Sequence, residues 1–80
     1  MTIKILGGGC KNCQTLYANT VEALQKEGLS ADIVKVTDFA QIAAMGVMQT
    51  PALVINDRVV SSGRTPGVKE IAALINKNRE

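Results

Sequence analysis

The segment TIKILGGGCKNC, residues 2–13, places two cysteines where an apolar strand gives way to a helical pattern. Thr2–Leu6 alternates polar and apolar residues, which is typical of a β-strand. From Asn12 onward, apolar residues recur on one helical face, at Cys13, Leu16, Tyr17, Val21 and Leu24. The segment therefore predicts a strand, a sharp glycine turn, and a helix that begins at the cysteines and ends at Gly28.

The rest of the chain continues the alternation of strands and helices. It predicts a strand over Ala31–Val36, followed by a short helix over Phe39–Met45 that is capped by Asp38 and ended by Gly46. A central strand over Ala52–Ile55, a hairpin turn at Asn56-Asp57 and a strand over Arg58–Ser61 come next. The last predicted element is a helix capped by Thr65, with Pro66 at its first position. The order β-α-β-α-β-β-α over residues 1–80 predicts one α/β domain with a four-stranded mixed sheet and helices on both faces.

Composition excludes several classes of function. The chain is 46% hydrophobic, carries a net charge of +2, and has only Tyr17 and Phe39 as aromatic residues, so nucleic-acid binding is not expected. No stretch has the length of a membrane span, and the first residues lack the pattern of a signal peptide. We therefore expect a cytoplasmic protein, a compartment in which closely spaced cysteines are usually redox-active or metal-binding.

Cys10 and Cys13 are the only cysteines, and their spacing at a helix start predicts different roles. The free N–H groups at the helix start, together with Lys11, lower the pKa of the Cys10 thiol toward about 7 or below. Cys13 lies one turn further on, on the apolar face, where burial keeps its thiol protonated. Cys10 is thus the expected nucleophile and Cys13 the resolving thiol of a thiol–disulfide exchange.

Metal binding is the main alternative use of this pair. A structural zinc site needs four Cys or His ligands, and the chain has two cysteines and no histidine, although a dimer could share four thiolates. Cu(I) needs only two sulfur ligands, so a soft-metal carrier stays open. Gly7-Gly8-Gly9 does not match a phosphate-binding loop, and we interpret it as a turn that leaves the Cys10 sulfur uncovered.

The CxxC at the first helix, the Thr50-Pro51 dipeptide before the third strand, and the terminal hairpin and helix resemble the thioredoxin superfamily. The chain is similar to its small prokaryotic members, often called redox-active disulfide proteins, especially over residues 46–56 and 60–64. The resemblance implies one thioredoxin-like domain over residues 1–80, without a cofactor. It implies a cis Pro51 beside Cys10, which holds the substrate backbone together with Thr50. Gly9, Lys11 and Asn12 would support the dithiol.

The resemblance also implies partners: a protein substrate that contains a disulfide, and a disulfide reductase, acting on a monomer. The chain departs from full thioredoxins because no acid occurs in the first strand. Asp32 and Asp38 are the nearest candidates for a buried proton acceptor. Glutaredoxins usually carry a Gly-Gly-Asp-like motif before the last helix, where this chain has Ser62-Gly63-Arg64; Arg64 could meet a glutathione carboxylate, but a surface arginine needs no such role. A third hypothesis is a redox-sensing adaptor that docks through Val47 and Met48.

Overall fold

The computed structural model describes residues 1–78 and has the predicted order of elements. The elements are β1 (Thr2–Leu6), α1 (Lys11–Glu27), β2 (Asp32–Val36), α2 (Phe39–Ala44), β3 (Ala52–Ile55), β4 (Arg58–Ser62) and α3 (Val68–Asn78). The strands form one sheet in the order β2-β1-β3-β4. β1 pairs parallel to β2 and antiparallel to β3, and β3 pairs antiparallel to β4. The α/β fold with a four-stranded mixed sheet is therefore confirmed.

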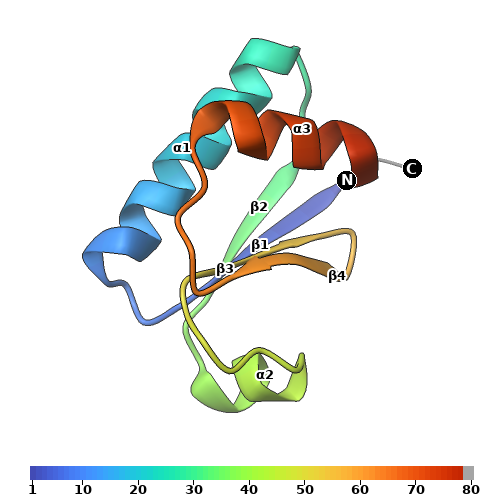
Figure 1. Ribbon diagram of the computed structural model, residues 1–80. Coiled ribbons are helices and arrows are strands. Elements are labelled where there is room, and N and C mark those ends of the chain that lie inside the picture. The colour runs from blue at the N-terminus through green and yellow to red at the C-terminus, as the bar shows by residue number, and fades with distance from the viewer. Residues whose placement is uncertain (79–80) are drawn as a thin grey trace.

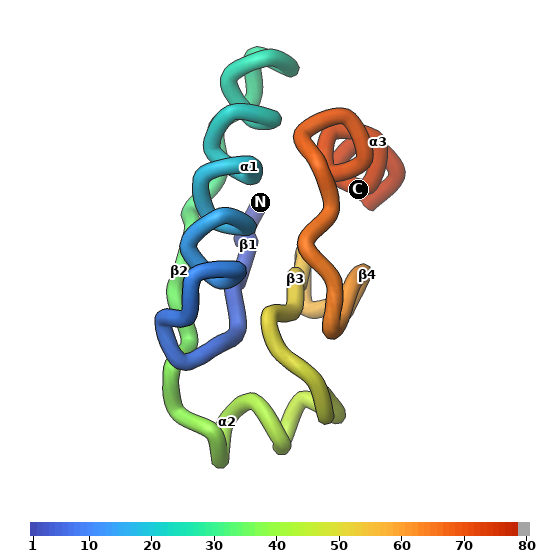
Figure 2. The backbone as a smooth tube through the Cα atoms, turned by 60° about the vertical axis from the view of Figure 1, so that its left-hand side comes forward, coloured from blue at the N-terminus to red at the C-terminus, as the bar shows by residue number. Residues whose placement is uncertain are grey.

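α1 and α3 lie over the sheet, whereas α2 lies beyond the end at which β1 and β2 finish (Figure 1). α1 and α3 pack on one face, where a core cluster joins buried residues of both helices to Ile3, Ile5, Leu53 and Ile55. α2 lies toward the other face, where Ile42 joins a second cluster that includes Leu6, Ala52 and Val54. Figure 2 shows α2 set apart from the other helices, at the end of the sheet where β1 and β2 finish.

β3 is the strand that unites the two cores. All four of its residues are buried, with Ala52 and Val54 in one cluster and Leu53 and Ile55 in the other. Burial of each of the larger side chains contributes roughly 1.5–3 kcal/mol relative to exposure. This burial explains why the strand is apolar at every position, as the sequence predicted.

The ends of α1 and α2 follow local chemistry. Gly28 takes φ 64 at the end of α1, where its N–H donates to Gln25 O at 3.2 Å. The Asp38 carboxylate accepts from Ala40 N at 2.8 Å and begins α2. Asn56 and Asp57 both have positive φ, 50 and 66, and form the predicted tight turn between β3 and β4.

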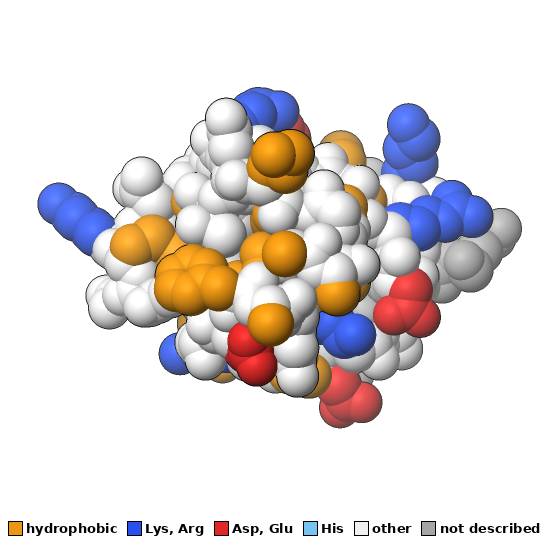
Figure 3. All heavy atoms as spheres, turned by 90° about the horizontal axis from the view of Figure 1, so that it is seen from below, with side chains coloured by type: hydrophobic (Ala, Val, Ile, Leu, Met, Phe, Trp, Pro, Cys, Tyr) orange, Lys and Arg blue, Asp and Glu red, His pale blue; other side chains and the backbone are white. Residues whose placement is uncertain are grey.

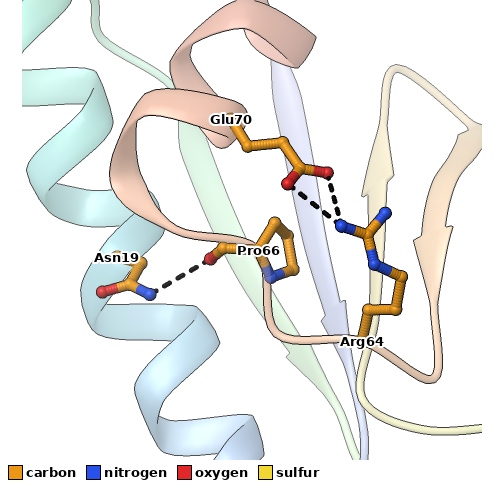
Figure 4. Close-up of polar contacts among 4 residues, drawn as sticks. All are labelled: Asn19, Arg64, Pro66 and Glu70. Atoms are coloured by element: carbon orange, nitrogen blue, oxygen red, sulfur yellow. Dashed lines mark hydrogen bonds and ion pairs between the residues drawn. The ribbon is translucent and has the colours of Figure 1, made fainter.

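The start of α3 differs from the prediction. Thr65 does not cap the helix and Pro66 is not its first residue, because the first helical hydrogen bond runs from Ile71 N to Gly67 O at 3.0 Å. The Pro66 carbonyl instead accepts from Asn19 Nδ2 of α1 at 3.1 Å (Figure 4). This tertiary hydrogen bond anchors the connection to α1, and the helix begins two residues later.

Candidate active site

Cys10 occupies the N-cap of α1 and its side chain is exposed. Its Sγ accepts from the backbone N–H of Cys13 at 3.2 Å, so the sulfur takes the place of the oxygen that usually caps a helix. The first turn of α1 holds no acidic residue, and Lys11 lies next to the cysteine. The helix end therefore favours a negative charge on this sulfur.

Cys13 lies one turn inside α1 and is only 5% exposed. The structure joins its sulfur to that of Cys10 in a disulfide, with the two Cα atoms 5.0 Å apart. One sulfur of the pair thus faces solvent at a helix end, and the other is covered by protein. The exposure of Cys10 and the burial of Cys13 are those expected from the sequence.

Each of the three glycines before Cys10 meets a different constraint. Gly7 is buried, and a Cβ on it would overlap Cys13 Sγ. A Cβ on Gly8 would lie 3.4 Å from the ring of Phe39, while Gly9 takes φ 83 in open space. The sequence predicted only a turn that uncovers Cys10, whereas the structure also shows a close approach to Cys13.

Thr50 and Pro51 form the second side of the site. Their peptide bond is cis, and the Pro51 carbonyl accepts from Gly63 N at 2.9 Å. Thr50 Cβ lies 3.7 Å from the position that a Cβ on Gly7 would take. Gly7 therefore lies between Thr50 and Cys13, which brings the loop before β3 next to the dithiol.

An apolar groove opens beside Thr50. Its volume is about 370 Å³, and it is lined by Phe39, Ile42, Ala43, Val47, Met48 and Thr50. Phe39 is 68% exposed and Met48 96% exposed, which is unusual for side chains of this size. Figure 3 shows hydrophobic side chains gathered on the α2 end of the molecule. No motif in the sequence marks Phe39 as a site residue, although its position at the start of a short helix capped by Asp38 is compatible with exposure.

The other candidate residues are more dispersed. Lys11 and Asn12 stand exposed in the first turn of α1, and the Gly9 carbonyl accepts from Gln14 Nε2 at 3.3 Å. Asp38 is committed to the cap of α2, and Asp32 is exposed at the start of β2. Across residues 1–78, no cluster of three or more His, Cys, Asp or Glu side chains is placed to hold a metal ion.

Arg64 is engaged within the protein. Its Nη2 lies 3.0 Å from the carboxylate of Glu70, on the first turn of α3 (Figure 4). The guanidinium that could meet a glutathione carboxylate is therefore paired with a carboxylate of its own chain.

Comparison with known proteins identifies the arrangement. Residues 1–76 match the family described as the thioredoxin domain. The chain belongs to the thioredoxin family. A thioredoxin from Methanocaldococcus jannaschii is 41% identical over 71 residues, which cover 89% of this chain and 81% of that protein. A thioredoxin from Methanothermobacter thermautotrophicus is 33% identical over 75 residues, or 94% and 97% of the two chains.

A solved structure of a malarial protein has the same fold, with a TM-score of 0.68 at 15% identity over 96% of this chain and 94% of that one. Family membership and the Cys10–Cys13 disulfide make the chain a thiol–disulfide oxidoreductase. Members of this family generally act on proteins that contain disulfides, and reductases are their general partners. Within the described part of the chain, no helix combines the length and apolarity needed to cross a membrane.

Proposed function

We propose that the protein reduces disulfides of protein substrates in the cytoplasm, with Cys10 as the attacking thiol and Cys13 as the resolving thiol. The observation that carries the assignment is the contrast between an exposed sulfur at the N-cap of α1 and a neighbour that is 5% exposed. An exposed thiolate can reach a disulfide on another protein. A buried thiol can reach only a sulfur already bound to Cys10.

The reaction has two exchange steps. The Cys10 thiolate attacks one sulfur of the substrate disulfide; a mixed disulfide forms, and the first substrate thiolate leaves and takes a proton from solvent. Cys13 then loses its proton, and its thiolate attacks Cys10 Sγ. The intramolecular disulfide forms, and the second substrate thiolate leaves and is protonated. Two electrons pass from the dithiol to the substrate, and a partner reductase returns them.

Thr50 and Pro51 are proposed to hold the substrate backbone beside Cys10. The position of Thr50 against Gly7 supports this role, because Gly7 also contacts Cys13. The apolar groove next to Thr50 gives an extended polypeptide a surface on which to rest its side chains. Gly9 supports the dithiol because it turns the chain just before Cys10. Lys11 and Asn12 are proposed to support it as the two residues between the cysteines, exposed in the first turn of α1.

A protein reductase, rather than glutathione, is the proposed electron donor. The ion pair between Arg64 and Glu70 supports this choice, since a glutathione carboxylate would have to compete with Glu70 for the guanidinium. The protein is proposed to act as a monomer, as one domain over residues 1–80.

The first test is the redox equilibrium of the purified, metal-free protein in graded dithiol buffers, read by thiol alkylation and mass spectrometry. A reversible two-electron couple between about −180 and −300 mV supports the proposal. If no intramolecular disulfide forms while Cu(I) protects both thiols from alkylation, the protein is a metal carrier instead. The element order β-α-β-α-β-β-α argues against that outcome, because small copper carriers have the order βαββαβ, in which two strands follow one another after the first helix.

A further inference from the structure

An exposed thioether lines the groove beside Thr50. The Met48 side chain is 96% exposed and shares the groove with Phe39, on the α2 end of the molecule where Figure 3 shows hydrophobic side chains gathered. The groove adjoins both loops of the site, because a Cβ on Gly8 would lie 3.4 Å from the Phe39 ring and Thr50 belongs to the cis-proline loop. A change at Met48 therefore alters a surface next to the dithiol and leaves the dithiol itself intact.

The backbone before Met48 explains this exposure. Met45 ends α2, and its side chain packs against the core cluster that contains Ile42. Gly46 then takes φ 80 and turns the chain. Val47 is only 6% exposed, and its N–H donates to Ile42 O at 3.4 Å. The Val47 side chain thus takes the core side of this segment, and Met48 is left on the solvent side.

The other sulfur atoms of the oxidised protein are less available to an oxidant. The chain contains two cysteines and three methionines, and the disulfide occupies both cysteine sulfurs. Met1 packs against the core under α1 and α3, Met45 packs against the second core cluster, and both are only partly exposed. Oxidation of a thioether requires that the oxidant reach its sulfur. Met48 is therefore the sulfur that a dissolved oxidant reaches most easily.

The groove lining is poorly suited to a polar group. Apart from Thr50, its side chains are apolar, and none is charged. The cavity of about 40 Å³ beside Cys13 differs, because its lining includes Lys35, whose Nζ lies 4.4 Å from the centre of the Tyr17 ring. Oxidation to the sulfoxide turns an apolar thioether into a polar group. An apolar substrate side chain laid over that group would leave its oxygen without a hydrogen-bond donor, which opposes docking.

We propose that Met48 is a modification site, oxidised by hydroperoxides, and that its sulfoxide weakens the docking of protein substrates in the groove. The inference rests on the proposed function, in which the groove holds the substrate polypeptide. The Met48 sulfur attacks one oxygen of hydrogen peroxide, an S–O bond forms and the O–O bond breaks. The second oxygen departs as water with both protons, and the peroxide gains the two electrons that the sulfur loses. The modification slows reduction of proteins and spares reduction of small disulfides.

The test begins with the disulfide form of the protein and hydrogen peroxide. Peptide mass spectrometry follows the gain of an oxygen atom at each methionine, and we expect Met48 to react at least about fivefold faster than Met45. Dithiothreitol then reduces the disulfide, leaves the sulfoxide intact and is removed. The second-order rate constant for reduction of insulin should fall about threefold, while that for dithiodipyridine, a small neutral disulfide, should stay within about twofold.

Two matched variants locate the effect. Met48→Leu keeps an apolar side chain of similar size without the sulfur, so its insulin rate after peroxide should equal its own rate before peroxide. Met45→Leu should lose insulin rate as the wild type does, because Met45 does not line the groove. Methionine sulfoxide reductases A and B, one for each epimer of the sulfoxide, should restore the insulin rate of the treated wild type.

Three outcomes overturn the proposal. The first is an equal rate of oxidation at Met45 and Met48. The second is an unchanged insulin rate once Met48 is fully oxidised. The third is an equal loss of rate for insulin and dithiodipyridine, which would place the damage at the dithiol. If the protein reduces neither disulfide before peroxide is added, the proposed function fails instead.

Discussion

The backbone of Gly7 lies against the side chain of Cys13 so closely that a Cβ on Gly7 would overlap Cys13 Sγ. Gly7 is also fixed from the sheet, because its N–H donates to Val36 O at 2.9 Å. In the oxidised protein the disulfide also holds Cys13 Sγ in place, so the glycine and the sulfur separate only if β1 or α1 shifts. The cover over the resolving sulfur is backbone, which leaves no side chain to rotate out of the way.

The first prediction is that Gly7→Ala destabilises the oxidised protein by about 1–3 kcal/mol, as overpacking of a filled interior does. Gly8→Ala is the matched control, because a Cβ there would lie 3.4 Å from the Phe39 ring, an ordinary van der Waals contact, and the change should stay within about 0.5 kcal/mol. Urea unfolding of both variants gives the two free energies. Equal stabilities for the two alanine variants would show that Cys13 can move away from a Cβ on Gly7 at no cost in free energy.

The second prediction concerns the two cysteines. Cys10→Ser should abolish reduction of a protein disulfide, because the buried Cys13 cannot reach the substrate. Cys13→Ser should accumulate a mixed disulfide through Cys10, since the resolving thiol is missing. Non-reducing electrophoresis and mass spectrometry of the trapped species check both results. Comparable residual turnover in the two variants would contradict the assigned roles.

The third prediction separates protein substrates from small ones. Phe39→Ala and Met48→Ala should each raise KM for a protein disulfide several-fold, because they remove exposed walls of the groove beside Thr50. Reduction of dithiodipyridine should be unchanged, since that probe is too small to span the groove. Val59→Ala, which removes a half-exposed side chain on β4, is the control. If Val59→Ala raises KM as much, the groove has no special role.

Much of the fold was predictable because local patterns and burial agree. β3 reads as a central strand from its unbroken apolar run, and Gly28 and Asp38 mark helix ends through their own backbone and side-chain chemistry. The start of α3 was not predictable from local rules. Pro66 has the features of a first helical residue, but its carbonyl is taken by Asn19, which is 47 residues away in the sequence.

The site divides in the same way. The exposure of Cys10 and the burial of Cys13 followed from helix position and the apolar face of α1. The contact of Gly7 with Cys13, the groove at Phe39, and the placement of Lys35 over Tyr17 depend on how α1, α2 and β2 pack together. Such contacts join residues distant in sequence, and spacing alone carries no signal of them.

The last prediction tests how the loop that carries Pro51 is held. Gly63 has φ 68 and donates its N–H to the Pro51 carbonyl, and a Cβ on it would overlap the side chain of Gln49. Gly46 has φ 80 with no atom within 4 Å of its Cβ position, so Gly46→Ala measures the left-handed strain alone, about 1–2 kcal/mol.

Gly63→Ala should cost about 1 kcal/mol more than Gly46→Ala, because the Gln49 side chain must also move. Adding Gln49→Ala should recover part of that difference, and the double-mutant cycle should give a coupling energy of about 0.5–1 kcal/mol. Urea unfolding of the four variants supplies every term. A coupling energy near zero would mean that the Gln49 side chain changes rotamer at no cost. The contact with Gly63 would then not restrain the loop that carries Pro51.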